Sequence, residues 1–306
     1  MRLIAFAVFP GQGAQAIGMG KEVAAEVPAA AELYKKAAEI LGYDLLEIED
    51  KAKLDTTVVS QPAIFVASMA AVEKLRASEG GAATIDACNM CMGLSLGEYT
   101  ALAFAGAISF EDGVKITKAR GEAMQAASEA ATSGMVSVIG LDSEKVGELC
   151  KAASEASGGQ VAIANYLCNG NYACSGSMDA VEKVMEMAKP DFKARMAVKL
   201  AVAGAFHTDF MAPAVKTLEE VLKEVTVSKP RIPVISNVDA KAHSDPEVIK
   251  SILTKQVTAP VQWETIMKDL IAGGYEAGYE LGPGAVLSGI MKRTDKKAPA
   301  IENIGV

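Results

Sequence analysis

The sequence contains little histidine and an odd, small number of cysteines. Only two histidines, His207 and His243, occur among 306 residues, so a metal site built on imidazole is poorly supplied and any imidazole base must be one of these two. Five cysteines spread over a long chain do not form the disulfide framework of a secreted protein, and we expect a reducing compartment. Cys88 and Cys91 form a CxxC, but no second pair completes a tetrahedral metal site, so we interpret them as structural or incidental and expect no metal.

Positive charge and long apolar runs are also scarce. Lys and Arg number 30 against 38 Asp and Glu, and the net charge of −8 disfavours broad binding to nucleic acid or anionic lipid, although a local basic patch stays open. The opening MRLIAFAVFP carries one positive charge and only a short apolar run before Pro10, too little for a secretory signal or a membrane span. We therefore expect no targeting peptide in this chain, or one already removed, and no nucleic-acid or membrane partner.

The composition is that of an ordinary globular protein, with 50% hydrophobic and 22% charged residues, and the length indicates about two folding units. An apolar strand at Leu3 to Phe9 runs into a glycine-rich turn and a helix over 21–41, and a second helix follows Gln61 and Pro62. A loop rich in Gly and Ala then precedes a short strand at 87–92 and a helix-prone stretch from Glu98. Strands that feed helices through such turns predict an α/β fold with a parallel sheet.

The stretch from about Gly134 to Leu200 has a different order of predicted strands and helices. Its predicted order is βαββαβ, with helices over 143–156 and 179–188, which is typical of a ferredoxin-like unit. We interpret residues 133–201 as a small subdomain inserted into a large one formed by residues 1–132 and 202–306. After the insertion the α/β pattern returns.

One motif places a serine in a chemically informative context. Gly93-Leu94-Ser95-Leu96-Gly97 matches G-x-S-x-G directly after a predicted strand and before a predicted helix. The glycines tolerate a tight turn, and the first free N–H groups of the helix point to where an oxyanion develops during acyl transfer. A serine nucleophile needs a base that titrates near neutrality, which histidine supplies. His207, between a strand-like run and a helix start, is the better candidate, because His243 lies among polar turn residues.

The turn after the first strand allows a second interpretation. GQGAQA at residues 11–16 fits G-x-G-x-x-A, a dinucleotide fingerprint. That fingerprint requires an acidic residue about 20 residues later, at the end of the next strand. The candidate here, Glu32, falls inside a predicted helix, so we favour a loop whose backbone N–H groups face the Ser95 elbow.

These motifs are part of a larger resemblance. Nine stretches between about Phe6 and Arg293 resemble, in order and spacing, those of malonyl-CoA:acyl carrier protein transacylases. Their amino-acid sequences most resemble those of plastid members from plants and algae. The stretches are FPGQGAQ, QPAIF, GLSLGEYTAL, KARGEAMQ, NYLCNGNYACSG, GAFHTDFM, PVISNVDA, QVTAPVQWE and ELGPGAVLSGIMKR. The resemblance implies an α/β-hydrolase-like core that carries the ferredoxin-like insertion.

The resemblance also implies roles for individual residues. Ser95 is the expected nucleophile and His207 the base, with the main-chain carbonyl of Gln256 orienting the imidazole in place of a triad carboxylate. Backbone N–H groups of Gln12 and Leu96 are expected to form the oxyanion hole.

Four further residues are expected to bind the substrate. Arg120 would grip the malonyl carboxylate, because its planar fork of donors matches a carboxylate two at a time. Gln61 and Asn171 would line the pocket. Phe206 would crowd a methyl group on the malonyl carbon, so methylmalonyl-CoA should be a poor substrate.

Two positions depart from the bacterial members of the family. Leu94 precedes the serine where bacterial members usually have His, and plastid members share this Leu. Asn169-Gly170-Asn171 replaces their Pro-Gly-Gln, and the shorter amide makes the pocket role of Asn171 less direct.

The implied reaction is ping-pong transfer of malonyl from malonyl-CoA to the phosphopantetheine thiol of acyl carrier protein, through a malonyl-Ser95 ester and without a metal or redox cofactor. Fatty acid synthesis is the expected pathway, and a monomer is the working expectation. Localisation would be the plastid stroma for a plant or algal protein and the cytoplasm otherwise.

Because acyl carrier proteins are acidic, we expect a basic docking patch. The candidates are Lys193, Arg195 and Lys199 on the last strand of the small subdomain, with Lys292 and Arg293 near the end of the chain.

Two other functions remain open at this point. An α/β-hydrolase esterase or thioesterase would share the elbow, with its acid between Ser and His in the chain, but would have no need of Arg120. A non-catalytic module that binds carrier protein would leave Ser95, His207 and Arg120 unexplained.

Overall fold

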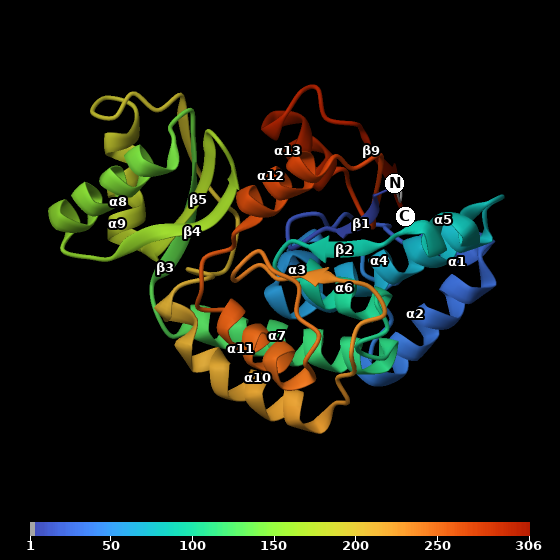
Figure 1. Cartoon of the computed structure of the whole chain (residues 1–306). Coiled ribbons are helices and arrows are strands. Elements are labelled where there is room, and N and C mark those ends of the chain that lie inside the picture. The colour runs from blue at the N-terminus through green and yellow to red at the C-terminus, as the bar shows by residue number, and fades with distance from the viewer. Residues whose placement is uncertain (1–3) are drawn as a thin grey trace.

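The computed structural model describes residues 4–306, and these form two β-sheets, each covered by its own helices (Figure 1). The larger sheet is parallel, in the order β7-β2-β1-β8-β9. Its strands are β1 (Ala5–Phe9), β2 (Met90–Gly93), β7 (Val234–Ile235), β8 (Ala277–Leu281) and β9 (Ile301–Ile304). The predicted α/β fold with a parallel sheet is confirmed, and Leu3, predicted to start the first strand, lies outside the described residues.

Helices cover both faces of this sheet, as its central strand requires. In β1, Ala7 and Phe9 face a core that includes helices before and after β2, whereas Phe6 and Val8 face a second core that includes Trp263. Every residue of β1 is therefore buried, as expected for a parallel strand covered on both sides. The helices are α1 (Lys21–Glu26), α2 (Pro28–Leu41), α3 (Lys51–Asp55), α4 (Thr57–Ala77), α5 (Gly81–Ala87), α6 (Gly97–Phe104), α7 (Phe110–Glu129), α10 (Ala212–Glu224), α11 (Pro246–Gln256), α12 (Trp263–Gly273) and α13 (Val286–Thr294), with the short 3-10 helix η1 (Asp209–Met211).

The smaller sheet is antiparallel, in the order β4-β5-β3-β6. Its strands are β3 (Ser133–Ile139), β4 (Val161–Cys168), β5 (Asn171–Ser177) and β6 (Met196–Lys199), with helices α8 (Ser143–Ser157) and α9 (Met178–Ala188) between them. The order of elements is β3-α8-β4-β5-α9-β6, as the sequence pattern predicts. α8 and α9 share a core with Val136, Val138 and Tyr172 on one face of the sheet. The other face turns towards the large sheet (Figure 1).

Several predicted boundaries are wrong, each for a local reason. The helix expected over 21–41 is two helices, because Val27 precedes Pro28 and takes an extended conformation. The helix expected to follow Pro62 begins at Thr57 and contains that proline near its start. The Gly/Ala-rich stretch expected as a loop contains α5, which ends at Ala87, so the strand expected at 87–92 begins at Met90.

Helix α4 is long and apolar enough to cross a membrane by length and composition, yet 78% of its most apolar window is buried inside the fold, as in a core helix.

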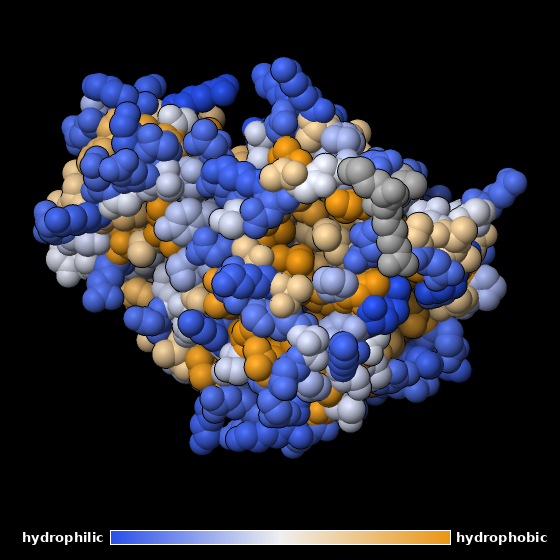
Figure 2. Space-filling view, viewed as in Figure 1, coloured by the Kyte–Doolittle hydropathy of each residue, from blue (hydrophilic) through white to orange (hydrophobic). Residues whose placement is uncertain are grey.

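All five cysteines are buried free thiols. Burial raises the pKa of Cys88 to about 11, which keeps this thiol protonated at neutral pH. On the viewed face, the outer helices of the small sheet are largely hydrophilic, and the surface is hollowed between the small subdomain and helices α12 and α13 (Figure 2).

Candidate active site

Ser95 occupies the apex of the turn between β2 and α6, in a conformation that only the flanking glycines permit. Its φ is +53°, in the left-handed region that non-glycine residues rarely adopt. A Cβ on Gly93 would lie 2.0 Å from the Gly97 carbonyl carbon, and one on Gly97 would lie 2.1 Å from the Phe9 carbonyl oxygen. Strand, turn and helix therefore approach more closely than any side chain at these two positions would allow.

The backbone of Ser95 is held from both sides by distant side chains. Its N–H donates to Asn237 Oδ1 at 2.6 Å, and its carbonyl accepts from Gln256 Nε2 at 3.0 Å. Asn237 also donates through Nδ2 to the Gly93 carbonyl at 2.7 Å. These contacts span more than 140 residues of sequence and hold the strained elbow in place.

His207 is placed to take the Ser95 proton. Its Nε2 lies 2.8 Å from Ser95 Oγ, and its Nδ1 lies 2.8 Å from the main-chain carbonyl of Gln256. Because a carbonyl only accepts, Nδ1 carries the proton and Nε2 is free to accept from the serine hydroxyl. Burial, and secondly the charge of Arg120, lowers the pKa of His207 from 6.5 to about 4, so the imidazole is neutral at pH 7.

The other histidine is not near this centre. His243 pairs with Asp239, Nε2 to Oδ2 at 2.9 Å, on a partly exposed turn. The structure thus brings Ser95, His207 and the Gln256 carbonyl together, as the family resemblance implies, and leaves His243 out.

Arg120 is a buried cation beside the nucleophile. Its side chain is 1% exposed and donates to Ser95 Oγ at 3.1 Å, to Gln256 Oε1 at 2.9 Å and to Gln61 Oε1 at 2.8 Å. It also lies over the ring of Tyr99, 5.3 Å from the centroid. No acidic side chain among residues 4–306 forms an ion pair with it, and its Nε has no partner there. A buried guanidinium paired only with neutral groups provides a site for an anion.

A cavity of about 290 Å³ opens onto these groups from both subdomains. Ser95, Arg120 and His207 form its polar side. The rest of its wall is mostly apolar, from Leu94, Met124, Met135, Leu167, Ala173, Leu200, Val202, Phe206, Val286 and Ile290. Phe206, next to the base, lines it as expected.

The oxyanion donors expected from the resemblance are available. Gln12 lines the cavity, and Leu96 directly precedes α6. Within the described part of the chain neither backbone N–H has an acceptor, whereas the N–H of Ser95 is already bound by Asn237. Gly11 brings the Gln12 loop against the elbow, because a Cβ there would lie 2.4 Å from the Leu94 carbonyl oxygen.

Two expected pocket residues lie elsewhere. Asn171 begins β5 and accepts a hydrogen bond from Ser137 Oγ at 3.1 Å, away from the cavity, which β5 reaches two residues later at Ala173. Gln61 is fully buried behind Arg120 and holds its guanidinium instead of lining the wall. Two residues along a strand span about 7 Å, so Asn171 lies that far along β5 from the cavity residue Ala173 and outside the site.

Three residues of the site were missed by sequence reasoning. Asn165 on β4 lines the cavity, and its buried Oδ1 has no partner among residues 4–306. Asn237 holds the elbow, and Glu98, in the first turn of α6, is buried beneath it. All three stand in stretches that carry the family resemblance, but only their folded contacts reveal their place in the site.

The five basic docking candidates are all exposed. β6 begins at Met196, so only Lys199 belongs to the last strand, and Lys193 and Arg195 precede it. Lys199 is followed by Leu200, and Lys292 and Arg293 follow Ile290 on α13; Leu200 and Ile290 both line the cavity. Lys199 therefore lies next to a wall residue of the small subdomain, and Lys292 and Arg293 lie close to one of the large subdomain, whereas Lys193 and Arg195 lie further from the cavity, before β6.

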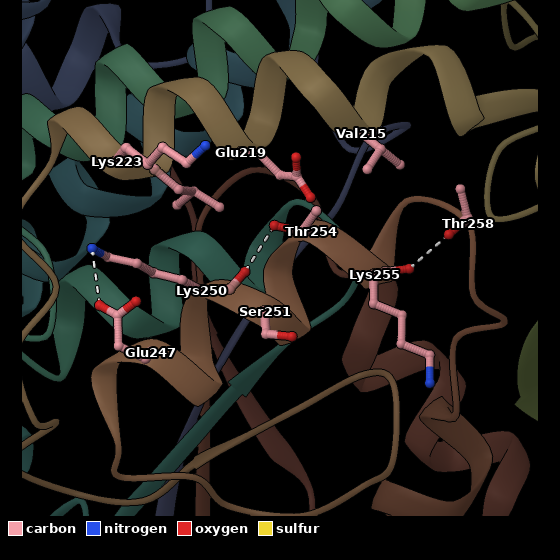
Figure 3. Close-up of a pocket in the computed structure, with 10 residues that line it drawn as sticks. Val215, Glu219, Lys223, Glu247, Lys250, Ser251, Thr254, Lys255 and Thr258 are labelled. Carbon is pink, nitrogen blue, oxygen red and sulfur yellow. Dashed lines mark hydrogen bonds and ion pairs between the residues drawn. The ribbon is translucent and has the colours of Figure 1, made fainter.

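A larger groove, of about 550 Å³, lies between α10 and α11 (Figure 3). Its walls carry Glu219 and Lys223 on α10 and Lys250, which pairs with Glu247 at 3.3 Å, on α11. It contains none of the Ser95, His207 and Arg120 groups, so size alone does not identify the reactive site.

Comparison with known proteins places this geometry in context. The family model described as the acyl transferase domain matches residues 6–306. The human mitochondrial malonyl-CoA-acyl carrier protein transacylase is 40% identical over 304 residues, covering 95% of this chain and 77% of the relative. The Bacillus subtilis malonyl CoA-acyl carrier protein transacylase is 39% identical, covering 98% and 93%.

Solved structures of malonyltransferases have the same fold as this chain. An acyl-carrier-protein S-malonyltransferase from Bartonella henselae superposes with a TM-score of 0.91 at 34% identity, covering 99% of this chain and 96% of the other. A malonyl-transacylase in complex with its type II polyketide acyl carrier protein superposes with a TM-score of 0.88 at 32% identity, covering 98% and 94%.

Proposed function

Since the chain belongs to the malonyl-CoA:acyl carrier protein transacylase family of acyl transferases, we propose that Ser95 carries a malonyl group from malonyl-CoA to the phosphopantetheine thiol of acyl carrier protein. The chain is an acyltransferase that supplies malonyl groups for fatty acid synthesis. The observation that carries the proposal is the buried, acid-free Arg120 at 3.1 Å from the nucleophile. No esterase acting on an uncharged acyl group requires such a cation.

The first half of the reaction forms the acyl-enzyme. Ser95 Oγ attacks the thioester carbonyl of malonyl-CoA while His207 Nε2 accepts its proton across the 2.8 Å contact. The N–H groups of Gln12 and Leu96 stabilise the oxyanion of the tetrahedral intermediate. The C–S bond then breaks, His207 returns the proton to the leaving thiolate, and a malonyl-Ser95 ester remains.

The second half reverses the first with a different thiol. The pantetheine thiol of carrier protein gives its proton to His207, and its sulfur attacks the ester carbonyl. The C–O bond to Ser95 breaks, and Ser95 Oγ regains the proton from His207. The Gln256 carbonyl, 2.8 Å from Nδ1, keeps the imidazole in the tautomer that both halves need. The exchange consumes no redox equivalents. Because His207 supplies the base and the backbone N–H groups of Gln12 and Leu96 supply the oxyanion donors, we propose that it uses no cofactor.

Selection of the acyl group follows from the two sides of the cavity. The malonyl carboxylate would be bound by the Arg120 guanidinium, which forms no ion pair with an acidic residue in the described part of the chain. Phe206 occupies the wall beside His207, where a methyl branch on the malonyl carbon would meet its ring. Both features favour malonyl over acetyl and methylmalonyl groups.

The carrier protein is proposed to dock on the basic residues of β6, of the segment that precedes it and of α13. Lys193, Arg195 and Lys199 stand on one side, and Lys292 and Arg293 on the other. An acidic partner positioned between them would point its pantetheine arm into the cavity.

The finer fold assignment is supported by the order of elements. Residues 133–201 carry the βαββαβ sequence and the strand order β4-β5-β3-β6, which fits a ferredoxin-like subdomain. Residues 1–132 and 202–306 would form an α/β-hydrolase-like core, in which a parallel sheet presents a serine elbow. From the sequences of its motifs we further propose that the enzyme is of the plastid type. We also propose that it is a monomer, located in the stroma in a plant or alga and in the cytoplasm otherwise.

The discriminating experiment follows the fate of the malonyl group. Purified protein is mixed with malonyl-CoA, with and without phosphopantetheinylated acyl carrier protein, and malonyl-carrier and free malonate are quantified. A transacylase gives malonyl-carrier in large excess over malonate. Malonate formation at the same rate with and without carrier would instead identify a thioesterase, and binding of carrier without either product would identify a non-catalytic module.

A further inference from the structure

Glu98 is a buried carboxyl group that the proposed reaction does not use. It lies in the first turn of α6, three residues after the nucleophile, and its side chain is 3% exposed. Its Oε2 accepts from Gln256 Nε2 at 2.7 Å and from the backbone N–H of Asn237 at 3.0 Å. No Lys, Arg or His among residues 4–306 forms an ion pair with it. A buried acid of this kind is costly to keep, so its contacts call for a function.

The contacts of the Gln256 side chain can be satisfied in only one orientation. Nε2 donates to Glu98 Oε2 and to the Ser95 carbonyl, and Oε1 accepts from Arg120. A carboxylate only accepts hydrogen bonds and a guanidinium only donates them. If the amide turned over, Nε2 would face the Arg120 donors and Oε1 would face the Glu98 carboxylate. The ionised carboxylate therefore fixes which end of the amide points to Arg120.

The reacting groups depend on this amide and on its neighbour. Gln256 binds the Ser95 carbonyl, the Arg120 guanidinium and, through its own carbonyl, the His207 imidazole. Asn237, whose N–H binds the same Glu98 oxygen, holds the Ser95 N–H. Both clamps on the strained serine thus converge on one carboxylate oxygen.

We propose that Glu98 is a positioning residue whose ionised carboxylate locks the Gln256 amide and the Asn237 backbone, and through them the geometry of Ser95, His207 and Arg120. The proposal rests on the proposed function only for the identity of the acyl group. It assigns to Glu98 no contact with substrate.

The protonation state of Glu98 follows from the groups that face it. Burial raises the pKa of Glu98 from 4.5 to about 7, while the hydrogen bonds from Asn237, Gln256 and Ser236 and the charge of Arg120 oppose this rise. Tyr99 neighbours it on α6, and His243 borders the same small internal space. Protonation would remove the charge that strengthens the hydrogen bonds from Gln256 and Asn237, and it would let the carboxyl group carry a donor beside them. The active arrangement is therefore the one with Glu98 ionised, and it is lost as the pH falls through about 7.

The test compares Glu98→Ala and Glu98→Gln with wild type. Glu98→Gln keeps a carbonyl oxygen for Gln256 and Asn237 and can turn its amide NH₂ to Ser236, but it cannot titrate. Rapid-quench mass measurement gives the rate of malonyl-Ser95 formation between pH 5 and 8.5. Glu264→Gln, at a buried acid that binds Tyr172 and Lys268 and does not line the cavity, is the matched control.

We expect Glu98→Ala to slow acylation about a hundredfold, the loss typical of a displaced reacting group. Glu98→Gln, which resembles protonated Glu98, should recover only part of that loss at pH 8 and should match the slower wild-type rate below pH 7. Its rate should no longer fall near pH 7 but only at lower pH, towards the titration of His207. An unchanged rate in Glu98→Ala, or an acid limb at the wild-type pH in Glu98→Gln, overturns the proposal. Thermal unfolding of each variant identifies one that does not fold, and the pH profile of Glu98→Gln then decides alone.

A second readout separates this proposal from the proposed function. Phenylmethylsulfonyl fluoride reacts with an activated serine and carries no malonyl group. Its rate with Ser95 should follow the same order, wild type and Glu264→Gln fastest, then Glu98→Gln, then Glu98→Ala. If wild-type protein reacts with the fluoride but not with malonyl-CoA, the proposed function is wrong. The ranking of the variants' rates with the fluoride then still decides the role of Glu98.

Discussion

The guanidinium of Arg120 donates to Ser95 Oγ across 3.1 Å, so the cation proposed to bind the acyl carboxylate also contacts the nucleophile. The same Oγ lies 2.8 Å from His207 Nε2. A malonyl carboxylate that binds Arg120 takes over donors that otherwise reach Ser95 and Gln256. Substrate binding and nucleophile geometry are therefore coupled through one side chain.

Arg120→Ala should abolish the preference for malonyl groups. Loss of one partner of a buried charge pair costs about 3 to 5 kcal/mol, so malonyl transfer should fall by about a hundredfold or more. Acetyl groups have no distal carboxylate, and their transfer should stay unchanged or improve. Arg120→Lys, which keeps the charge without the planar fork, should give an intermediate loss. The measurement is kcat/KM for malonyl-CoA and acetyl-CoA, and equal losses for both would make Arg120 a structural residue only.

The two histidines should respond very differently to substitution. His207→Ala removes the base at 2.8 Å from Ser95 Oγ and should slow malonyl-enzyme formation by about 10²- to 10⁴-fold. His243→Ala serves as the control, because His243 contacts Asp239 and does not line the cavity. Single-turnover acylation rates measure both, and a comparable loss in the two variants would reject His207 as the base.

His207 should also make the fold acid-sensitive. Its pKa is about 4 in the folded state and 6.5 as a reference, so the neutral form is favoured by folding. The stability it contributes is complete above about pH 6.5 and is lost as the pH falls through about 4. Urea unfolding at pH 7 and pH 4 should show a smaller acid-induced loss in His207→Gln than in wild type. An identical loss in both proteins would mean that His207 is not held neutral by burial.

The sequence predicts the reactive elbow well because its determinants are local. Gly93, Ser95 and Gly97 lie within one turn of the chain, and a Cβ on Gly93 would clash with the Gly97 backbone inside that turn, although Gly97 also lies against the Phe9 carbonyl of β1. The break before Pro28 is also local, but helical periodicity continues across it and conceals the extended Val27. Periodicity reports buried faces, not the continuity of a helix.

Other parts of the site depend on register and on distant contacts. Asn165 and Asn171 stand in one motif, but only Asn165 lines the cavity, and it follows an irregular register between Ile163 and Asn165 in the pairing of β4 with β5. That irregularity has no clear sequence signal. Glu98 meets Gln256 and Asn237 across more than 135 residues, a contact that only the fold creates.

The docking patch predicts a defect confined to the second half-reaction. Reversal of Lys193 and Arg195 to Glu should raise KM for acyl carrier protein about tenfold, since each exposed pair contributes up to about 1 kcal/mol. Malonyl-enzyme formation should be unchanged. Reversal of Lys35 and Lys229, which are exposed and lie outside the cavity lining, is the matched control. Salt should weaken transfer in wild type more than in the Lys193 and Arg195 variant, and an unchanged salt-sensitive rate would exclude this patch.

The most direct test of the account is the intact mass of the protein after brief exposure to malonyl-CoA, followed by peptide mapping. We predict a gain of one malonyl group, located on Ser95, in wild type and in the Ser251→Ala control. Ser251 is an exposed serine on α11 that is not part of the cavity. Ser95→Ala should show no adduct. A malonyl group on any other residue, or its persistence in Ser95→Ala, would contradict the central claim that Ser95 carries the acyl group.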